Sequence, residues 1–415
     1  MHTVADASRS VLARIRRLDV EDVPLADCVG RVLARDIVAR ASMPPWDNSS
    51  MDGYAVRSSD IASATIESPV RLDVTGDIPA GGFATRELST GEAMRIMTGA
   101  PVPQGADSVV RIEDTDYGMD AVSVRVPGPV GRNIRCAGED FTKGITALAA
   151  GTPLEAAHVG VLASLGHSAV PAFRAPRVAI ISSGDELTEI SGYAEVIAGK
   201  KIVSSNNYTL AALVREAGAI PVDLGIAKDS VESLREKFEQ ARGSDLIITS
   251  AGVSVGEKDF TRDAVDQLGG EQIFWRVKMR PGAPLAFGMV NEIPWLGLSG
   301  NPVSAMVSFI LFAKPAIRKM MGHSLLFPSL ITARAEEKIE TSAPLTHFLR
   351  AVLTQTDAGF TARLSGSQSS GVMTALALAN ALLVVPENVS CIPEGGAVQA
   401  IPINSSSRMT GSIAF

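Results

Sequence analysis

The chain has 415 residues, of which 46% are hydrophobic and 20% are charged, a composition that excludes wholesale disorder. Its 38 basic and 45 acidic residues leave a net charge of −7, which argues against a general nucleic-acid binder. At roughly 150 residues per domain, this length predicts about two to four domains.

The number of cysteines and the length of the apolar stretches indicate in which cellular compartment the protein is expected. The three cysteines, Cys28, Cys136 and Cys391, are too few and too scattered for a disulfide framework or a zinc site. The N-terminus has no apolar run, so we expect no signal peptide. The most apolar stretch, residues 303–313, is shorter than the ~20 residues that a membrane span needs. We therefore expect a cytoplasmic protein in a reducing compartment, with no membrane contact.

The first predicted element is an amphipathic helix over residues 6–18. Val11, Ile15 and Leu18 recur at helical spacing, and arginines occupy the opposite face. Residues 44–140 differ, because short alternating runs are separated by Gly- and Pro-rich turns. That stretch predicts a small β-rich domain.

Apolar strands alternate with helices from residue 177 onward. The runs 178–181 and 246–249 are strand-like, whereas 205–217 and 230–241 have helical spacing. Such alternation predicts βαβ units and a mostly parallel sheet, and strands without polar alternation predict that both of its faces are covered. After about residue 325, short strands and turns return, which predicts a C-terminal β domain.

A further helix is predicted to start at Pro302. Asn301 can cap this helix, and Pro302 then stands at the first helical position, where its missing N–H costs nothing. Pro315 is expected to kink the helix or to end its regular part.

Three loops are predicted at the carboxyl ends of the parallel strands, where ligands bind in open α/β sheets. They span residues 182–186, 250–259 and 298–302. Their small residues let backbone N–H groups approach a phosphate, and acids beside a phosphate suggest a bridging Mg²⁺. The alternative is three ordinary turns with helix-capping acids. The sequence has neither a GxGxxG nor a Walker motif after a predicted strand, which disfavours nicotinamide cofactors and P-loop hydrolysis.

Three cations recur with a period of two at Arg276, Lys278 and Arg280. In a single strand they would project from one face and form an anion site. The alternative is a strand edge that its charges protect from pairing, and periodicity alone leaves both open.

Longer segments resemble the MoeA family of molybdopterin molybdenumtransferases, which is related to the E domain of gephyrin and to its plant counterpart. The similarity runs from about residue 44 to 370. The segments are PPWDNSSMDGYAV at 44–56, RIMTGAPVPQGAD at 95–107, GRNIR followed by GED within 131–140, SSGDEL at 182–187, TSAGVSVGEKD at 249–259 and GNPVS at 300–304.

The resemblance implies a multidomain α/β plus β fold. Residues 1–43 and 141–170 would form a discontinuous linker domain, with an inserted β-rich domain at 44–140. A molybdopterin-binding α/β domain at 171–325 and a β-barrel-like domain at 326–415 would follow. Family members are elongated homodimers, so the active site is expected between the α/β domain of one subunit and the β-rich domain of the other.

The implied reaction joins adenylylated molybdopterin with molybdate. Mg²⁺ would assist cleavage of the phosphoanhydride, AMP would leave, and the dithiolene of molybdopterin would hold molybdenum. Molybdopterin adenylyltransferase and apo-molybdoenzymes are the expected partners. A cradle of N–H groups for phosphate, carboxylates for Mg²⁺ and cations for molybdate would serve these steps.

Site residues follow from the loops and the matched motifs, with Glu186 and Asp259 also expected to bind the metal. The expected catalytic residues are Asp52, Thr98, Asp140, Glu186, Asp229 and Asp259. The expected cofactor-binding residues are Ser183, Gly184, Ser250, Gly252, Ser254, Gly256, Arg276, Arg280, Gly300, Asn301, Pro302, Arg350, Ser369 and Ser370.

The chain departs from the family pattern near the expected molybdate site. Ala283 replaces the lysine of PGKP, Ser299 replaces the proline before GNPVS, and Ala251 replaces a glycine. Lys278 could substitute for the missing lysine. Because of these departures, two other hypotheses stay open: a catalytically weak relative that acts as a molybdopterin carrier or scaffold, and an insertase that uses tungstate.

Overall fold

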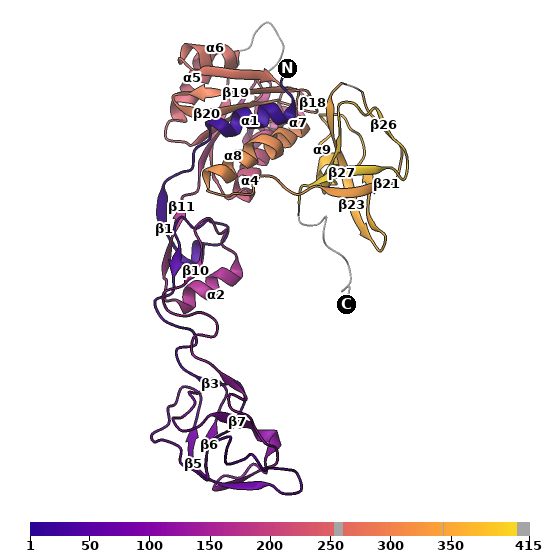
Figure 1. The fold of residues 1–415 in the computed structure, drawn as a ribbon. Coiled ribbons are helices and arrows are strands. Elements are labelled where there is room, and N and C mark those ends of the chain that lie inside the picture. The colour runs from indigo at the N-terminus through magenta and orange to yellow at the C-terminus, as the bar shows by residue number, and fades with distance from the viewer. Residues whose placement is uncertain (253–259, 343, 405–415) are drawn as a thin grey trace. The chain divides into compact units, whose positions relative to one another are not determined.

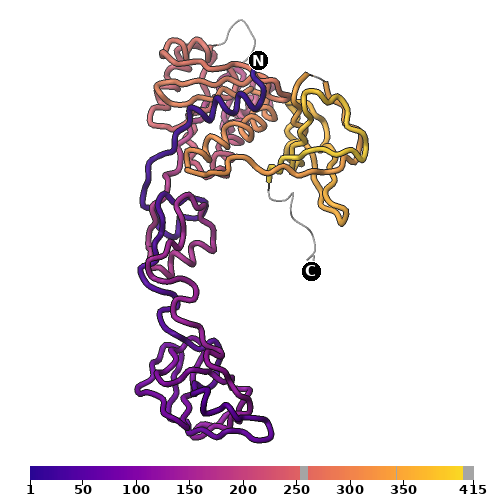
Figure 2. Tube along the Cα trace, viewed as in Figure 1, coloured from indigo at the N-terminus to yellow at the C-terminus, as the bar shows by residue number. Residues whose placement is uncertain are grey.

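The structure is a computed structural model that describes residues 1–252, 260–342 and 344–404. The chain forms two compact units and passes between them more than once. Unit 1 comprises Met1–Ala34, Gly151–Glu155 and Ala169–Phe415, and unit 2 comprises Arg35–Ala150 and Ala156–Ser168. The colours in Figure 2 show that the N-terminal helix shares unit 1 with the second half of the chain. Across the described ranges, none of the helices has both the length and the apolar character of a membrane span.

A six-stranded sheet forms the centre of the α/β part of unit 1 (Figure 1). In spatial order its strands are β15 (Ile220–Ala227), β12 (Arg177–Ser183), β16 (Leu246–Ser250), β20 (Ile293–Leu298), β19 (Pro284–Val290) and β17 (Glu271–Arg276). The first four are parallel, whereas β19 runs antiparallel to both of its neighbours. The prediction of a mostly parallel sheet is therefore confirmed.

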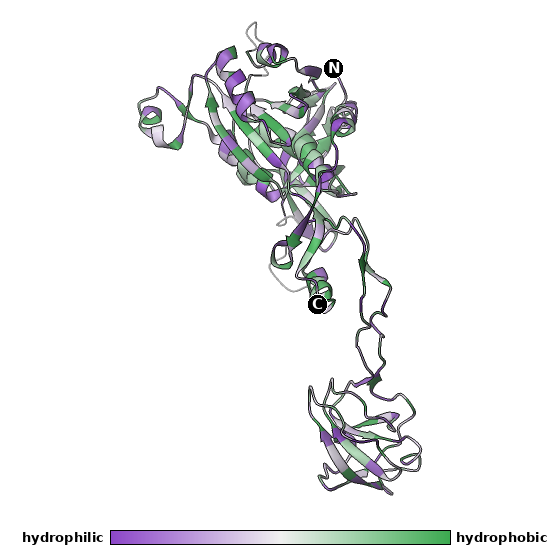
Figure 3. Ribbon diagram, turned by 90° about the vertical axis from the view of Figure 1, so that its left-hand side faces the viewer, coloured by the Kyte–Doolittle hydropathy of each residue, from purple (hydrophilic) through white to green (hydrophobic). Residues whose placement is uncertain are grey.

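Helices cover both faces of this sheet, as the continuous apolar strands predict. On the first face they are α1 (Val4–Arg14), α4 (Ser205–Glu216), α7 (Pro302–Ser308) and α8 (Lys314–Met320), and on the second α5 (Val231–Gln240) and α6 (Phe260–Gln267). Val178 and Ile180 join the core of the first face, and Ala179 and Ile181 join the core of the second. Figure 3 shows these hydrophobic strands between more hydrophilic helices.

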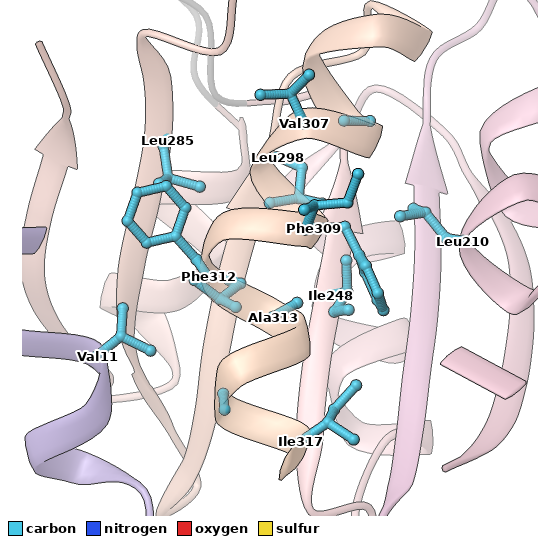
Figure 4. Packing of buried hydrophobic residues seen from close by; sticks show 14 of the residues in the cluster. Val11, Leu210, Ile248, Leu285, Leu298, Val307, Phe309, Phe312, Ala313 and Ile317 are labelled. Carbon is cyan, nitrogen blue, oxygen red and sulfur yellow. The ribbon is translucent and has the colours of Figure 1, made fainter. Parts of the chain in front are cut away.

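The helix that starts at Pro302 loses its regular α-helical geometry shortly before Pro315. A π-helical turn, Phe309–Ala313, joins α7 to α8, and Pro315 is the second residue of α8. The first regular α-helical part thus ends before Pro315, and the π-helical turn closely precedes the residue that lacks an N–H. Figure 4 shows Phe309 and Phe312 of this turn in the core with Val11 from α1.

The N-terminal helix is shorter than predicted. It starts at Val4 because the Thr3 side chain caps it by accepting from the Asp6 N–H at 3.1 Å. It ends at Arg14, and Ile15 continues in extended backbone while still packing into the core. The next elements are β1 (Val20–Pro24), which pairs antiparallel with β11 (Ala169–Phe173), and the short helix η1 (Leu25–Asp27).

An excursion leaves the sheet between β12 and α4. It contains β13 (Leu187–Thr188), η3 (Ile190–Gly192), α3 (Tyr193–Ile197) and β14 (Ile202–Val203). Because β13 and β14 pair in parallel, the end of the excursion returns beside its beginning.

A closed β-barrel forms the C-terminal part of unit 1 and confirms the predicted barrel-like domain. Around the barrel the strands are β23 (Thr346–Thr356), β24 (Gly359–Leu364), β21 (Ile331–Ala335), β27 (Ala397–Pro402) and β25 (Ala381–Val385), which pairs back with β23. The remaining elements there are β22 (Ile339–Glu340), β26 (Cys391–Ile392) and α9 (Met373–Ala377).

The cations with a period of two do not lie on one strand. The strand β17 ends at Arg276, and β18 (Met279–Arg280) pairs with β23 of the barrel instead of the α/β sheet. Val277 and Met279 are buried and alternate with the three cations. The spacing of two between the cations therefore comes from this alternation of buried and more exposed residues, and not from one continuous strand. The single-strand expectation is therefore wrong.

Unit 2 is built around a five-stranded sheet with two small cores. Its order is β7 (Ser108–Arg111), β4 (Gly53–Val56), β6 (Glu92–Ile96), β5 (Val70–Ile78) and β8 (Ala121–Val124). The other elements are β2 (Ile37–Val38), β3 (Asn48–Ser49), η2 (Ile112–Asp114), β9 (Ile134–Arg135), β10 (Thr146–Leu148) and α2 (Ala156–Ser164). The sheet confirms the β-rich character predicted for this stretch, whereas the predicted domain boundaries stay predictions.

Candidate functional site

A pocket of about 220 Å³ lies at the carboxyl ends of the parallel strands, and we call it the acidic pocket. Its lining consists of Ser183, Gly184, Glu186, Asp229, Leu234, Ala251, Gly252, Phe260 and Thr261. The sequence-predicted residues that meet here are Ser183, Gly184, Glu186, Asp229 and Gly252. They come from loops that follow three strands, which is where ligands bind in such sheets.

Two glycines let polar side chains approach the backbone in the acidic pocket. A Cβ at Gly184 would lie 2.6 Å from Oε2 of Glu186, so glycine allows this carboxylate to fold back over the loop. A Cβ at Gly252 would lie 2.0 Å from Oγ1 of Thr261. Both glycines have positive φ, +150° and +73°, which suits glycine. A larger residue at either position would displace the pocket lining.

Two aspartates tie neighbouring loops together at the rim of the pocket. The Asp185 N–H lies 3.4 Å from Oδ2 of Asp229, and the Asp229 N–H lies 3.4 Å from Oδ1 of Asp185. The two residues follow β12 and β15, which are parallel neighbours. The reciprocal contacts therefore hold Glu186 and Asp229 at one end of the sheet.

The acidic pocket contains side chains of the kind that binds Mg²⁺. Glu186 and Asp229 offer two carboxylates, and Mg²⁺ is commonly held by one or two carboxylates together with substrate phosphates. Within the described residues, no group of three or more metal-ligating side chains occurs. The expected site residues Ser254, Gly256 and Asp259 lie outside the described residues.

A second pocket, of about 660 Å³, lies between the α/β part and the barrel of unit 1, and we call it the Arg280 pocket. Its lining consists of Met279, Arg280, Pro281, Gly282, Ala283, Pro284, Ser299, Asn301, Ser304, Leu345, Gln368, Ser369 and Ser370. Four residues expected to bind the cofactor meet here: Arg280, Asn301, Ser369 and Ser370. Pro302 begins α7 beside this pocket, where the Val303 N–H donates to the Ser370 carbonyl at 3.3 Å.

Arg350 lines a smaller neighbouring pocket of about 290 Å³ together with Arg280 and His347. Its side chain is fully buried, and Nη2 donates to the carbonyls of Ser367 at 2.7 Å and Ser369 at 3.0 Å. Burial lowers the pKa of this guanidinium. Among the described residues, its Nε and Nη1 have no hydrogen-bond partner. A buried cation with donors left over is suited to an anionic ligand.

Asn206 joins the two strand-end loops that frame both pockets, and sequence reasoning missed it. Its Nδ2 donates to Oγ of Ser250 at 2.6 Å and to the Gly300 carbonyl at 2.8 Å. A Cβ at Gly300 would lie 3.1 Å from Cβ of Ala251, which lines the acidic pocket. Ser250 and Gly300 thus stand between the acidic pocket and the Arg280 pocket. The only sequence signal was an asparagine pair at the start of a predicted helix.

Arg276 is not brought to these pockets. It lies exposed at the end of β17, and it is absent from the described linings of the acidic pocket, the Arg280 pocket and the smaller pocket that Arg350 lines. Lys278 follows it in the break between β17 and β18, and its N–H donates to the His2 carbonyl at 2.8 Å.

Unit 2 holds the other three expected site residues. Oδ1 of Asp52 accepts from the N–H and from the hydroxyl of Thr98, at 2.7 and 2.8 Å. These hydrogen bonds hold the pKa of Asp52 below its usual value of 3.8. Asp140 is exposed, and its N–H donates to the Met43 carbonyl at 3.1 Å. The structure therefore joins Asp52 to Thr98 and leaves Asp140 in a separate loop.

Known proteins resemble this chain along nearly its whole length. It is 39% identical to molybdopterin molybdenumtransferase 2 of Mycobacterium tuberculosis (strain ATCC 25618 / H37Rv), over 96% of this chain and 99% of that protein. The molybdopterin molybdenumtransferase of Bacillus subtilis (strain 168) is 36% identical, over 96% and 94%. The chain belongs to the MoeA family.

Family models cover three successive parts of the chain. They are the MoeA N-terminal region (domain I and II) at residues 2–166, a probable molybdopterin binding domain at 179–319 and the MoeA C-terminal region (domain IV) at 332–403. A solved structure of a molybdopterin biosynthesis moeA protein from Pyrococcus horikoshii OT3 has a TM-score of 0.83 at 31% identity, over 97% of this chain and 100% of that one. The resemblance to MoeA, and the fold that it implies, are thus confirmed.

Proposed function

We propose that the chain is a molybdopterin molybdenumtransferase. It would insert molybdenum from molybdate into adenylylated molybdopterin, with release of AMP, in the biosynthesis of the molybdenum cofactor. Curated relatives that share nearly the whole chain carry this name. The structural observation that supports the proposal is the adjacency of an acidic pocket to a pocket that contains Arg280, across the loops of Ala251 and Gly300.

In this proposal the acidic pocket would bind Mg²⁺ and the phosphates, and the arginines near the barrel would bind molybdate. Glu186 and Asp229 would hold Mg²⁺, which neutralises charge on the phosphoanhydride when it is bound. The backbone at Gly184 and Gly252 leaves room for the phosphates. Arg280 and Arg350 would hold the molybdate oxyanion next to the pterin, and their fixed donors favour an anion over water in this partly buried site.

The decisive assay measures AMP release from adenylylated molybdopterin, with and without Mg²⁺ and with molybdate, tungstate or neither. We expect AMP release that depends on both Mg²⁺ and an oxyanion, and Glu186→Gln should slow it by about 100-fold or more. Glu195→Gln, on the exposed helix α3, is the matched control and should leave the rate unchanged. Wild-type protein that releases no AMP under any of these conditions refutes the proposal.

A second function, a molybdopterin carrier or scaffold, is favoured by one observation. Ala283 lines the Arg280 pocket where family members usually have a lysine, so this wall of the pocket has less positive charge. Tight binding of the pterin without AMP release would support the carrier. Faster AMP release with tungstate than with molybdate would instead support a tungsten insertase.

We propose a cytoplasmic homodimer in which the Asp52–Thr98 pair of one subunit completes the acidic pocket of the other. Complementation tests this arrangement, because Asp52→Ala and Glu186→Gln inactivate different halves of a shared site. Mixing the two variants under subunit exchange should restore up to about a quarter of the wild-type activity, since a random mixture contains dimers with one intact site. Activity that stays at the level of the separate variants contradicts a shared site.

A further inference from the structure

The ladder between β13 and β14 brings a lysine beside the loop whose Glu186 lines the acidic pocket. Leu187 pairs with Ile202 in parallel, and the Ile202 N–H donates to the Glu186 carbonyl at 2.9 Å. The Ser204 N–H donates to the Thr188 carbonyl at 2.9 Å. These backbone bonds place residue 201 beside residues 185 and 186, although fifteen or more positions separate them along the chain. Lys201 is the residue at that position.

The ammonium group of Lys201 points to the loop that carries Glu186. Its Nζ donates to the carbonyl of Asp185, which is tied to Asp229 through the reciprocal contacts described above. An ammonium has three N–H donors, and this contact uses one. In the described part of the chain, Lys201 forms no ion pair. Its charge and two donors are therefore available to a ligand.

The carboxylates at the acidic pocket give it an excess of negative charge, which such a cation would offset. Asp185, Glu186 and Asp229 place three carboxylates at the ends of two neighbouring strands, and they would repel the phosphates of the proposed substrate. A divalent ion between two of these carboxylates offsets only part of their charge. Lys228 is exposed beside Asp229, but its side chain has no contact that directs it to the pocket among the described residues.

We infer that Lys201 binds a phosphate group of the substrate at the rim of the acidic pocket. The inference rests on the proposed function, since that function supplies a phosphate in this pocket. The phosphate could be that of the adenylate or that of the pterin. In either case the segment between β12 and α4 supplies a substrate-binding cation to this pocket.

Calorimetric titration with AMP and with adenosine tests the role of Lys201, because the two ligands differ only in the phosphate. Lys201→Gln should weaken AMP binding by about 10-fold, the size of one charge-assisted hydrogen bond, and leave adenosine binding unchanged. It should also reduce the salt dependence of AMP affinity, because one charge no longer faces the phosphate. Lys201→Arg should restore most of the affinity.

Lys200→Gln is the matched control, since Lys200 is the exposed neighbour with the same charge. It should bind AMP as the wild type does. If Lys201→Gln affects molybdopterin binding but not AMP binding, the lysine contacts the pterin phosphate, and the inference holds for that source. Equal losses for AMP and adenosine, or no loss for any phosphate ligand, overturn it. Wild-type protein that releases no AMP would instead defeat the proposed function, which separates the two failures.

Discussion

Ala251 occupies a backbone conformation that suits glycine. Its φ is +78°, in the left-handed region, and its N–H donates to the Leu298 carbonyl at 3.0 Å. A Cβ in this region approaches the backbone too closely and costs about 1 kcal/mol or more. The loop between β16 and the residues outside the described ranges therefore carries strain at the edge of the acidic pocket.

Ala251→Gly should stabilise the chain by about 1 kcal/mol, because it removes this strain at a small cost in unfolded-state entropy. Urea unfolding of the two proteins measures the difference. Ala251→Val, the opposite change, should destabilise, because a branched side chain fits this φ less well than alanine does. A glycine variant that is less stable than the wild type would show that the alanine methyl packs more favourably than its strain costs.

Ala283 sets the charge of the Arg280 pocket. Its side chain lines the pocket, and a lysine there would add a second cation next to Arg280. Ala283→Lys should tighten molybdate binding by about 5- to 10-fold, as one further charge-assisted contact would. Calorimetric titration with molybdate measures it, and Ala283→Met controls for side-chain length. Equal affinities for the lysine and methionine variants would mean that this position does not face the oxyanion.

At the scale of elements, the end of α8 contains a half-buried pair of basic residues, Arg318 and His323. His323 follows this helix, and its Nδ1 lies 3.3 Å from Nη2 of Arg318. Burial, together with the charge of Arg318, lowers the pKa of His323 from 6.5 to about 4. The imidazole is therefore neutral at pH 7, and Nδ1 accepts a hydrogen bond from the guanidinium.

This shift makes the stability of unit 1 depend on pH. Between pH 6.5 and 4 the unfolded chain binds a proton at His323 that the folded chain does not, so stability falls as pH falls through this range. We expect a loss of about 2 kcal/mol from this group, with allowance for the part of the ring that stays in water. Urea unfolding at pH 7 and pH 4 should show a smaller difference for His323→Gln. The same pH dependence in that variant would locate the effect elsewhere.

At the scale of the whole molecule, unit 2 has the means to fold by itself. Its five-stranded sheet and the two hydrophobic clusters packed on that sheet lie within residues 44–140, and β3 pairs with β9 inside the same stretch. A domain with its own core and few chain crossings folds alone. Residues 44–140 expressed alone should unfold in one cooperative transition, followed by circular dichroism.

A truncated version that ends at residue 130 is the control for this experiment. It removes β9 and the Asn133 side chain, whose Nδ2 donates to the Val109 carbonyl at 2.9 Å. We expect the truncated version to lose stability relative to residues 44–140. A broad, non-cooperative transition for 44–140 itself would show that the linker segments of unit 2 are required for folding.

Patterns of apolar residues predicted the helices and strands best where an element buries one constant face or is buried on both faces. The helices expected at 205–217 and 230–241 are α4 and α5, each within one residue of its predicted limits. Both strand runs at 178–181 and 246–249 are buried on two faces, so their apolar character was a direct signal. The limits of α1 were less accurate, because capping by Thr3 and the extended backbone after Arg14 outweighed the apolar spacing.

The amino-acid sequence by itself determined the fold class, the family and the strand-end loops, since these depend on motifs and on periodic burial within short segments. Tertiary structure alone decided that β18 leaves the sheet for the barrel, that Arg350 is buried, and that Asn206 joins two loops. It also decided that Lys201 returns beside Glu186. These features arise from pairing between distant segments, whose partners are chosen by the burial and hydrogen bonding of the complete fold and leave no periodic signal along the chain.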